Sequence, residues 1–112
     1  MTQVQTLDQI IDMLLKNKEK ILGFGVESLG IFGSFIHGKQ TSDSDVDIMV
    51  VFSKGQKSFR NFMSLVYYLE TLLGRKVELV TTESLSPYLK HYILEKIEYV
   101  KVAYRIFTTY PG

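Results

Sequence analysis

The chain has 112 residues, of which 46% are hydrophobic, so it is long enough for one packed core but leaves little room for a second domain. It has no cysteine, which excludes disulfides and thiolate metal ligands, and its formal net charge of +1 argues against direct nucleic-acid binding through charge alone. No apolar run approaches the roughly 18 residues of a membrane span, and the N-terminus lacks the basic region of a signal peptide. We therefore expect residues 1–112 to form one soluble, cytoplasmic domain with no membrane contact.

The spacing of apolar residues predicts alternating helices and strands. In chain order, we expect a helix over residues 7–21, a strand over 26–32, a turn with one helical turn over 33–44, a strand over 45–53, a helix over 59–73, a strand over 76–82 and a helix over 87–98. Thr6 followed by Gln9 predicts a capping box at the first helix, and Gly74 ends the second helix. Residues 99–112 fit either an added strand or an irregular segment. This order predicts an α/β (α+β) fold in which helices flank a small mixed central sheet.

Asp43, Asp45 and Asp47 occupy alternate positions at the start of the second strand. Because successive strand side chains alternate faces, Asp45 and Asp47 point the same way, with Cβ atoms roughly 6.5–7 Å apart. The strand behind them is apolar on both faces, so the two carboxylates are half sheltered and repel each other. A hard cation such as Mg²⁺ or Mn²⁺ removes that repulsion, and Mg²⁺ sites typically combine one or two carboxylates with substrate phosphates. Glu78, flanked by apolar residues in the third strand, is the candidate third acid.

Gly33 and Ser34 stand where the first strand ends. Glycine lets the backbone approach a ligand closely, and Ser34 offers a hydroxyl and an N–H at a turn or helix start, which suits a phosphate. Each feature alone also has an ordinary interpretation: Gly33-Ser34 as a glycine-bounded turn, Asp43 as a turn residue and Glu78 as an exposed strand residue. The combination of these features favours a site for a cation and a nucleotide.

Residues 33–50, GSFIHGKQTSDSDVDIMV, resemble the signature of the DNA polymerase β-like nucleotidyltransferases. The shared pattern is Gly-Ser after one strand followed by a paired Asp-x-Asp that opens the next. The short length resembles the minimal nucleotidyltransferases of that superfamily, and residues 74–100 resemble their downstream half, although with a less specific pattern. The resemblance covers nearly the whole chain and implies the polymerase-β-like fold.

The resemblance also implies a role for each matching residue. It places Gly33 and Ser34, with His37 nearby, at the nucleotide, and it makes Asp45 and Asp47 metal ligands. Glu78 falls at the third carboxylate, which orients or deprotonates the attacking hydroxyl and can ligate metal. Two residues depart from the family pattern, because the third acid is usually Asp and because His37 often has Arg in its place. As a bare residue, His37 also fits an ordinary surface position.

The chemistry implied by the resemblance is transfer of AMP from ATP to a hydroxyl, assisted by two Mg²⁺ ions, with Mn²⁺ as the alternative metal. The implied partner is a HEPN-domain toxin, which the chain would modify on a tyrosine and thereby neutralise as its antitoxin. Two other functions stay open. The chain could be a non-catalytic subunit that covers the active site of its partner, or a nucleotidyltransferase acting on a small molecule.

The tyrosines are expected in ordinary positions. Tyr67, Tyr68, Tyr88 and Tyr92 are predicted to lie at the edges of the core. The aromatic residues of the C-terminal tail fit either packing on the sheet or a surface for a partner, and these residues are Tyr99, Tyr104, Phe107 and Tyr110.

Overall fold

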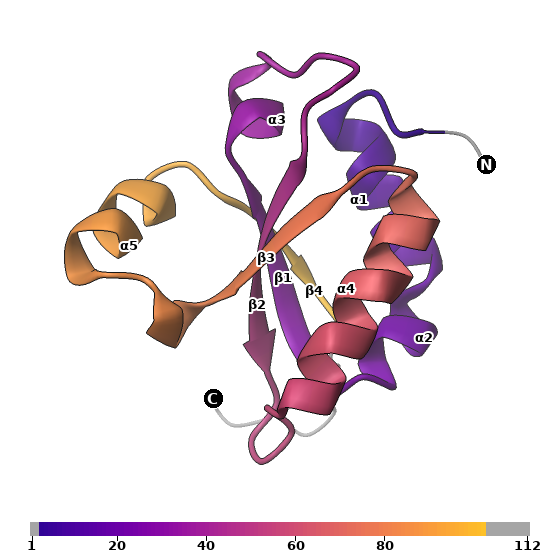
Figure 1. The fold of residues 1–112 in the computed structure, drawn as a ribbon, viewed down its shortest axis with the longest axis vertical. Coiled ribbons are helices and arrows are strands. Elements are labelled where there is room, and N and C mark those ends of the chain that lie inside the picture. Colours follow the sequence, from indigo (N-terminus) through magenta and orange to yellow (C-terminus); the bar gives the residue numbers. More distant parts are fainter. Residues whose placement is uncertain (1–2, 103–112) are drawn as a thin grey trace, which may run out of the picture.

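The computed structural model describes residues 3–102. Helices and strands alternate along the chain much as predicted, with five α-helices, a short 3₁₀ turn and four strands in this part of the chain (Figure 1). Their bounds are α1 Leu7–Lys16, α2 Lys18–Leu22, β1 Val26–Phe32, α3 Ser34–His37, β2 Val46–Phe52, α4 Phe59–Leu73, β3 Val77–Thr81, the 3₁₀ turn Thr82–Ser84, α5 Pro87–Leu94 and β4 Glu98–Lys101.

The four strands form one mixed sheet in the order β3-β2-β1-β4. β1 is antiparallel to both β2 and β4, whereas β2 and β3 are parallel. The connection between the parallel strands contains α4, as a crossover between parallel strands requires. The predicted mixed sheet flanked by helices is therefore confirmed, and so is the predicted pairing of the strands on either side of the acidic turn.

The hydrophobic core lies on one face of the sheet, because α1, α2 and α4 cover that face while α5 stands on the other side (Figure 1). Alternate residues of β2 point into this core, among them Val46 and Ile48, which are fully buried. The intervening positions, including Asp47, therefore face the side of the sheet that α1, α2 and α4 leave uncovered. This division of β2 into two faces is what exposes the acidic end of the sheet.

The predicted first helix is interrupted at Asn17, so the single helix over residues 7–21 was wrong. The Asn17 side chain donates a hydrogen bond to the Met13 carbonyl (2.8 Å), and its backbone N–H bonds to the Leu14 carbonyl (3.2 Å). Asparagine competes for backbone groups in this way and ends helices. Thr6 does cap α1 through the Gln9 N–H (3.1 Å), but the Gln9 side chain accepts from the Gln5 N–H instead of completing the capping box.

The C-terminal third also differs from the prediction. The helix α5 ends at Leu94 instead of residue 98, and β4 begins at Glu98, so the first part of the tail is an added strand. Tyr67, Tyr88 and Tyr92 are exposed and not at core edges, whereas Tyr68 is half-buried against Phe24. Tyr104, Phe107 and Tyr110 lie outside the described residues.

Within residues 3–102, no helix is both long and apolar enough to cross a membrane.

Candidate active site

The sheet register brings Gly33 against Asp47. Phe32, the last residue of β1, pairs with Asp47 near the start of β2, so the chain turns at Gly33 directly beside the aspartate. Gly33 has φ +79° and ψ −146°, a backbone conformation that is essentially restricted to glycine. A Cβ atom at this position would overlap the Asp47 carboxylate. Position 33 thus requires glycine for two reasons, which are the backbone conformation and the space that the Asp47 carboxylate occupies.

The short helix α3 starts immediately after this turn. Gly33 occupies its N-cap position and Ser34 is its first residue, as the sequence predicted for a helical turn after the first strand. Phe35 anchors the helix in the core at 2% exposure, which leaves Ser34 half-buried at the surface near Asp47. His37 is the last residue of α3 and is exposed.

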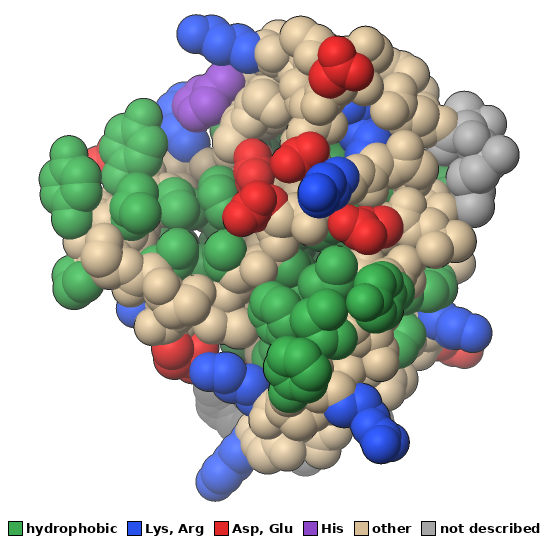
Figure 2. All heavy atoms as spheres, viewed as in Figure 1, with side chains coloured by type: hydrophobic (Ala, Val, Ile, Leu, Met, Phe, Trp, Pro, Cys, Tyr) green, Lys and Arg blue, Asp and Glu red, His purple; other side chains and the backbone are tan. Residues whose placement is uncertain are grey.

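Glu78 lies on the same face of the sheet as Asp47. In the parallel pairing of β2 with β3 the two residues are direct register partners, and such strands are about 4.8 Å apart. Figure 2 shows acidic side chains gathered over the ends of β2 and β3, beside α3. The strand pairing therefore places Glu78 beside Asp47, and a joint role of the three acids stays a prediction.

Electrostatics link Asp47 to the other two acids. The pKa of Asp47 is raised from 3.8 to about 6, first because burial desolvates the carboxylate and then because Glu78 and Asp45 repel its charge. Asp45 itself is exposed and lies one residue before β2, not within it as predicted. A carboxylate with a pKa near 6 can exchange a proton close to neutral pH, which is a property of groups that act as acids or bases.

The carboxylate oxygens of Asp45, Asp47 and Glu78 suit a hard cation, but the three side chains do not converge on one point. Among residues 3–102, no three His, Cys, Asp or Glu side chains lie close enough together to hold a metal ion as they stand. The Asp47 carboxylate lies against Gly33, whereas the side chains of Asp45 and Glu78 are exposed and would have to turn toward it. Oxygen donors of this kind fit Mg²⁺ or Mn²⁺, and the metal site stays a prediction.

The turn before Asp45 is held by two sets of hydrogen bonds. Within the turn, the Thr41 N–H donates to Ser44 Oγ (2.8 Å) and the Asp43 N–H to Thr41 Oγ1 (3.3 Å), which supports the interpretation of Asp43 as a turn residue. The second set comes from Arg75, a residue to which the sequence analysis assigned no role. The sequence gives no signal of this contact, because 31 residues separate Arg75 from Ser44.

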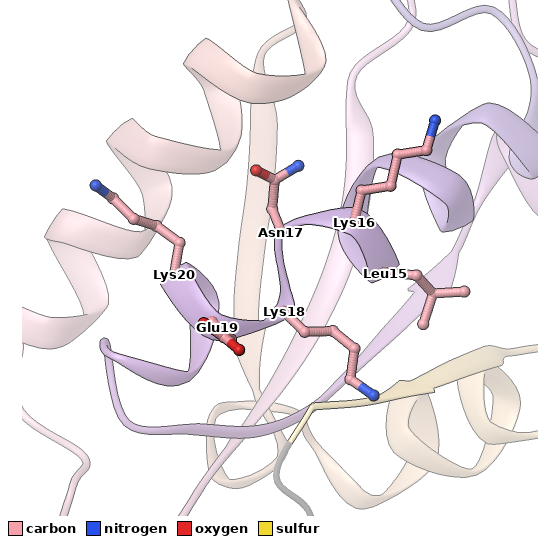
Figure 3. A pocket seen from close by; sticks show the side chains of 6 residues that line it. All are labelled: Leu15, Lys16, Asn17, Lys18, Glu19 and Lys20. Atoms are coloured by element: carbon pink, nitrogen blue, oxygen red, sulfur yellow. The ribbon is translucent and has the colours of Figure 1, made fainter.

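A hollow of about 760 Å³ lies away from the acids, at the break between α1 and α2. Figure 3 shows that the side chains of Lys16, Lys18 and Lys20 point in different directions there. Ligand sites need polar groups that converge on one point, so this hollow is not a candidate active site.

Comparisons with known proteins agree with this geometry. The nucleotidyltransferase domain family matches residues 10–100. The chain is 40% identical over 96 residues to the protein adenylyltransferase MntA of Thermococcus cleftensis, which covers 85% of this chain and 96% of the relative. It is 44% identical over 101 residues to MJ1379 of Methanocaldococcus jannaschii, whose name assigns it provisionally to the protein adenylyltransferases, with 87% of this chain and 100% of the relative covered.

Two solved structures share the fold. One is provisionally described as a minimal nucleotidyltransferase and has 29% identity and a TM-score of 0.61 over 79% of this chain and 93% of its own. The other is a toxin–antitoxin crystal structure with AMP-PNP, with 25% identity and a TM-score of 0.58 over 74% of this chain and 71% of its own. The chain belongs to the nucleotidyltransferase domain family, as a minimal member of the DNA polymerase β-like superfamily. The predicted family, fold and nucleotidyltransferase class are therefore confirmed.

We expect Gly33→Ala to impair nucleotidyl transfer more than tenfold, because the added Cβ displaces the Asp47 carboxylate and a misplacement of about 1 Å can cost such factors. Backbone strain should also lower stability by about 1–3 kcal/mol. Gly38→Ala is the matched control, since Gly38 also has a positive φ (+68°) but open space where its Cβ would lie. Urea unfolding and transfer assays of both variants check this, and equal activity in the two would contradict the role of Gly33.

Asp47→Asn should raise the melting temperature at pH 8 in the presence of EDTA. A carboxylate whose folded-state pKa is raised to about 6 contributes stability below pH 3.8 that is lost as the pH rises through 6. The gain on removing the charge should be about 1 kcal/mol after allowance for solvent screening. Thermal unfolding of the variant and of Asp43→Asn, which changes an exposed acid of the turn before β2, should show a gain that grows from pH 4 to pH 8 for Asp47 alone. A constant or negative difference would argue against repulsion at Asp47.

Proposed function

We propose that the chain transfers AMP from ATP to a hydroxyl of a partner protein, and that this partner is a HEPN-domain toxin modified on tyrosine. The observation that carries the proposal is the register of β2, which sets Asp47 between the Gly33 turn on one strand and Glu78 on the other. The chain would thereby act as an antitoxin. The similarity to a protein named protein adenylyltransferase MntA supports this choice over other nucleotidyl transfers.

The reaction needs a phosphate cradle and carboxylates at the same place. Ser34 and the backbone after Gly33 would bind the triphosphate, because the glycine permits close approach and the start of α3 presents a hydroxyl. Asp45, Asp47 and Glu78 would hold two Mg²⁺ ions, which supply neutralisation of phosphate charge when bound. His37, exposed at the end of α3, would give a weaker phosphate contact than the arginine often found there.

The bond changes follow from these roles. The tyrosine oxygen attacks the α-phosphorus of ATP, the bond from that phosphorus to the oxygen bridging to the β-phosphate breaks, and pyrophosphate leaves. Glu78 would orient the attacking tyrosine hydroxyl. The proton of that hydroxyl would pass to one of the three carboxylates of Asp45, Asp47 and Glu78.

The kind of partner is supported by structural relatives. The toxin–antitoxin structure with AMP-PNP combines a nucleotide analogue with an antitoxin assembly. A complex of tri-AMPylated Shewanella oneidensis HEPN toxin with its MNT antitoxin shares the fold at 21% identity and a TM-score of 0.51. The chain also exposes several aromatic side chains, including Phe59, Tyr88 and Tyr92, on surfaces that a partner could cover.

Neutralisation by binding alone is the second candidate. It is favoured by the absence, among residues 3–102, of three metal-binding side chains already close enough to hold an ion. In that case the chain would keep the fold and block its partner without chemistry. A small-molecule acceptor ranks below both, because the names of the curated relatives refer to protein adenylyltransferases.

The test uses ATP labelled at its α-phosphate, Mg²⁺ and a purified HEPN-domain protein as the acceptor. We expect label on a partner tyrosine by mass spectrometry, reduced more than a hundredfold in Asp45→Asn with Asp47→Asn, because removing members of one catalytic unit is severely damaging. Asp43→Asn is the matched control and should transfer label normally. If the double variant still neutralises the partner as well as the original chain, binding alone is the function.

A further inference from the structure

Arg75 is a buried cation without an acidic partner. It lies between α4 and β3 at 5% exposure, and no carboxylate among residues 3–102 forms an ion pair with it. One of its terminal nitrogens, Nη2, is buried without any hydrogen-bond partner. A buried charge of this kind is costly, and an apolar side chain of similar volume is commonly as stable or more so. The position of Arg75 therefore calls for a benefit other than stability.

The remaining nitrogens of Arg75 bind main-chain oxygens in two distant segments. Nε donates to the Val4 carbonyl (2.7 Å), ahead of α1, while Nη1 donates to the carbonyls of Thr41 (2.8 Å) and Ser44 (2.7 Å). The guanidinium also lies 4.9 Å from the centre of the Phe35 ring, a cation–π contact. The planar guanidinium of arginine can donate hydrogen bonds to several carbonyls in different segments, whereas the single ammonium group of lysine lacks this fork of donors.

These contacts reach each part of the proposed active site. Phe35 follows Ser34 in α3, Ser44 precedes Asp45, and Arg75 itself lies three residues before Glu78. Apart from Arg75, residues 41–44 are held by their own local hydrogen bonds and by an exposed contact from Gln3 to Ser42. The flanking residues are tied by the main chain, since the Lys39 N–H donates to the Ser34 carbonyl (3.0 Å) and the Val46 N–H to the Lys76 carbonyl (2.9 Å). Arg75 adds a buried side-chain connection from residues 41 and 44 to Phe35 of α3.

We propose that Arg75 is a positioning residue for nucleotidyl transfer, which holds the 41–44 turn and Phe35 so that Asp45 and Ser34 stay in place relative to Glu78. It acts through the main chain, because its nitrogens contact carbonyl oxygens and not the acids. The catalytic part of this inference rests on the proposed function. The structural part, that Arg75 immobilises the turn, does not.

The experiment compares Arg75→Met, which keeps the volume without the donors, with Arg75→Lys, which keeps the charge without the fork. Hydrogen exchange of peptides covering residues 38–48 should accelerate about tenfold or more in both variants, while peptides of α4 should exchange as before. The kcat for AMP transfer should fall at least tenfold, with KM for ATP changed less than about threefold, since misplacement affects the reacting geometry first.

Two controls separate positioning from general damage. Arg60→Met replaces an exposed arginine of α4 and should change neither measurement. Ile10→Val lowers core stability without removing a hydrogen-bond donor, and at an equal loss of melting temperature it should keep kcat. Should Arg75→Met fail to fold, Arg75→Lys carries the test.

The proposal would be overturned if residues 38–48 exchanged in the Arg75 variants as they do in the original chain. It would also be overturned if the Arg75 variants lost no more kcat than Ile10→Val, or if Arg75→Lys were fully active. If the original chain transferred no AMP at all, the proposed function would be wrong. The hydrogen-exchange measurement would still show whether Arg75 holds the turn.

Discussion

The registration of β2 between two neighbours is the constraint on which the proposed site depends. Its antiparallel partner β1 delivers the Gly33 turn to Asp47, and its parallel partner β3 delivers Glu78 to the same residue. A slip of one residue in either pairing would turn Asp47 into the core and Ile48 out of it. The fully buried side chains of Val46 and Ile48 prevent that slip, so the hydrophobic core sets the positions of the acids on the opposite face.

The acids oppose folding, and the rest of the domain compensates for them. Burial and like charge raise the pKa of Asp47 to about 6, which means that its ionised form is less stable in the folded chain than in water. The core formed by α1, α2, α4 and one face of the sheet supplies the compensating stability. This arrangement separates the two tasks, because the face that stabilises the fold contains none of the proposed catalytic groups.

Local features of the fold were predictable from the sequence, and contacts between distant segments were not. The strands on either side of the acidic turn and the helix ending at Gly74 follow from residue spacing and glycine chemistry, which act over a few residues. The break at Asn17 was missed because it depends on side-chain competition for the Met13 carbonyl within an otherwise regular pattern. The end of α5 at Leu94 was missed because that helix has no buried residue to give it a clear apolar period.

For the candidate site, too, the sequence predicts local features but not contacts between distant segments. Gly33, Ser34, Asp47 and Glu78 were predicted from strand ends and a family pattern, and the sheet pairs Asp47 with Glu78 and with Phe32, the residue before Gly33. That Asp47 touches the Gly33 backbone, and that Arg75 holds the turn before Asp45, depend on tertiary contacts that no sequence spacing encodes.

The contrast between Asp47 and its neighbours bears on how the proposed site would work. The carboxylate of Asp47 is half-buried and lies against Gly33, whereas Asp45 and Glu78 are exposed. The longer side chain of Glu78 extends its reach by about one C–C bond compared with Asp, so it can approach the nucleotide from its strand. In the proposed function, the half-buried acid marks the location and the two exposed acids close on the bound ions and substrate. Such a site gains its full geometry only when ligand is present, since the energy of binding then opposes the repulsion among the three charges.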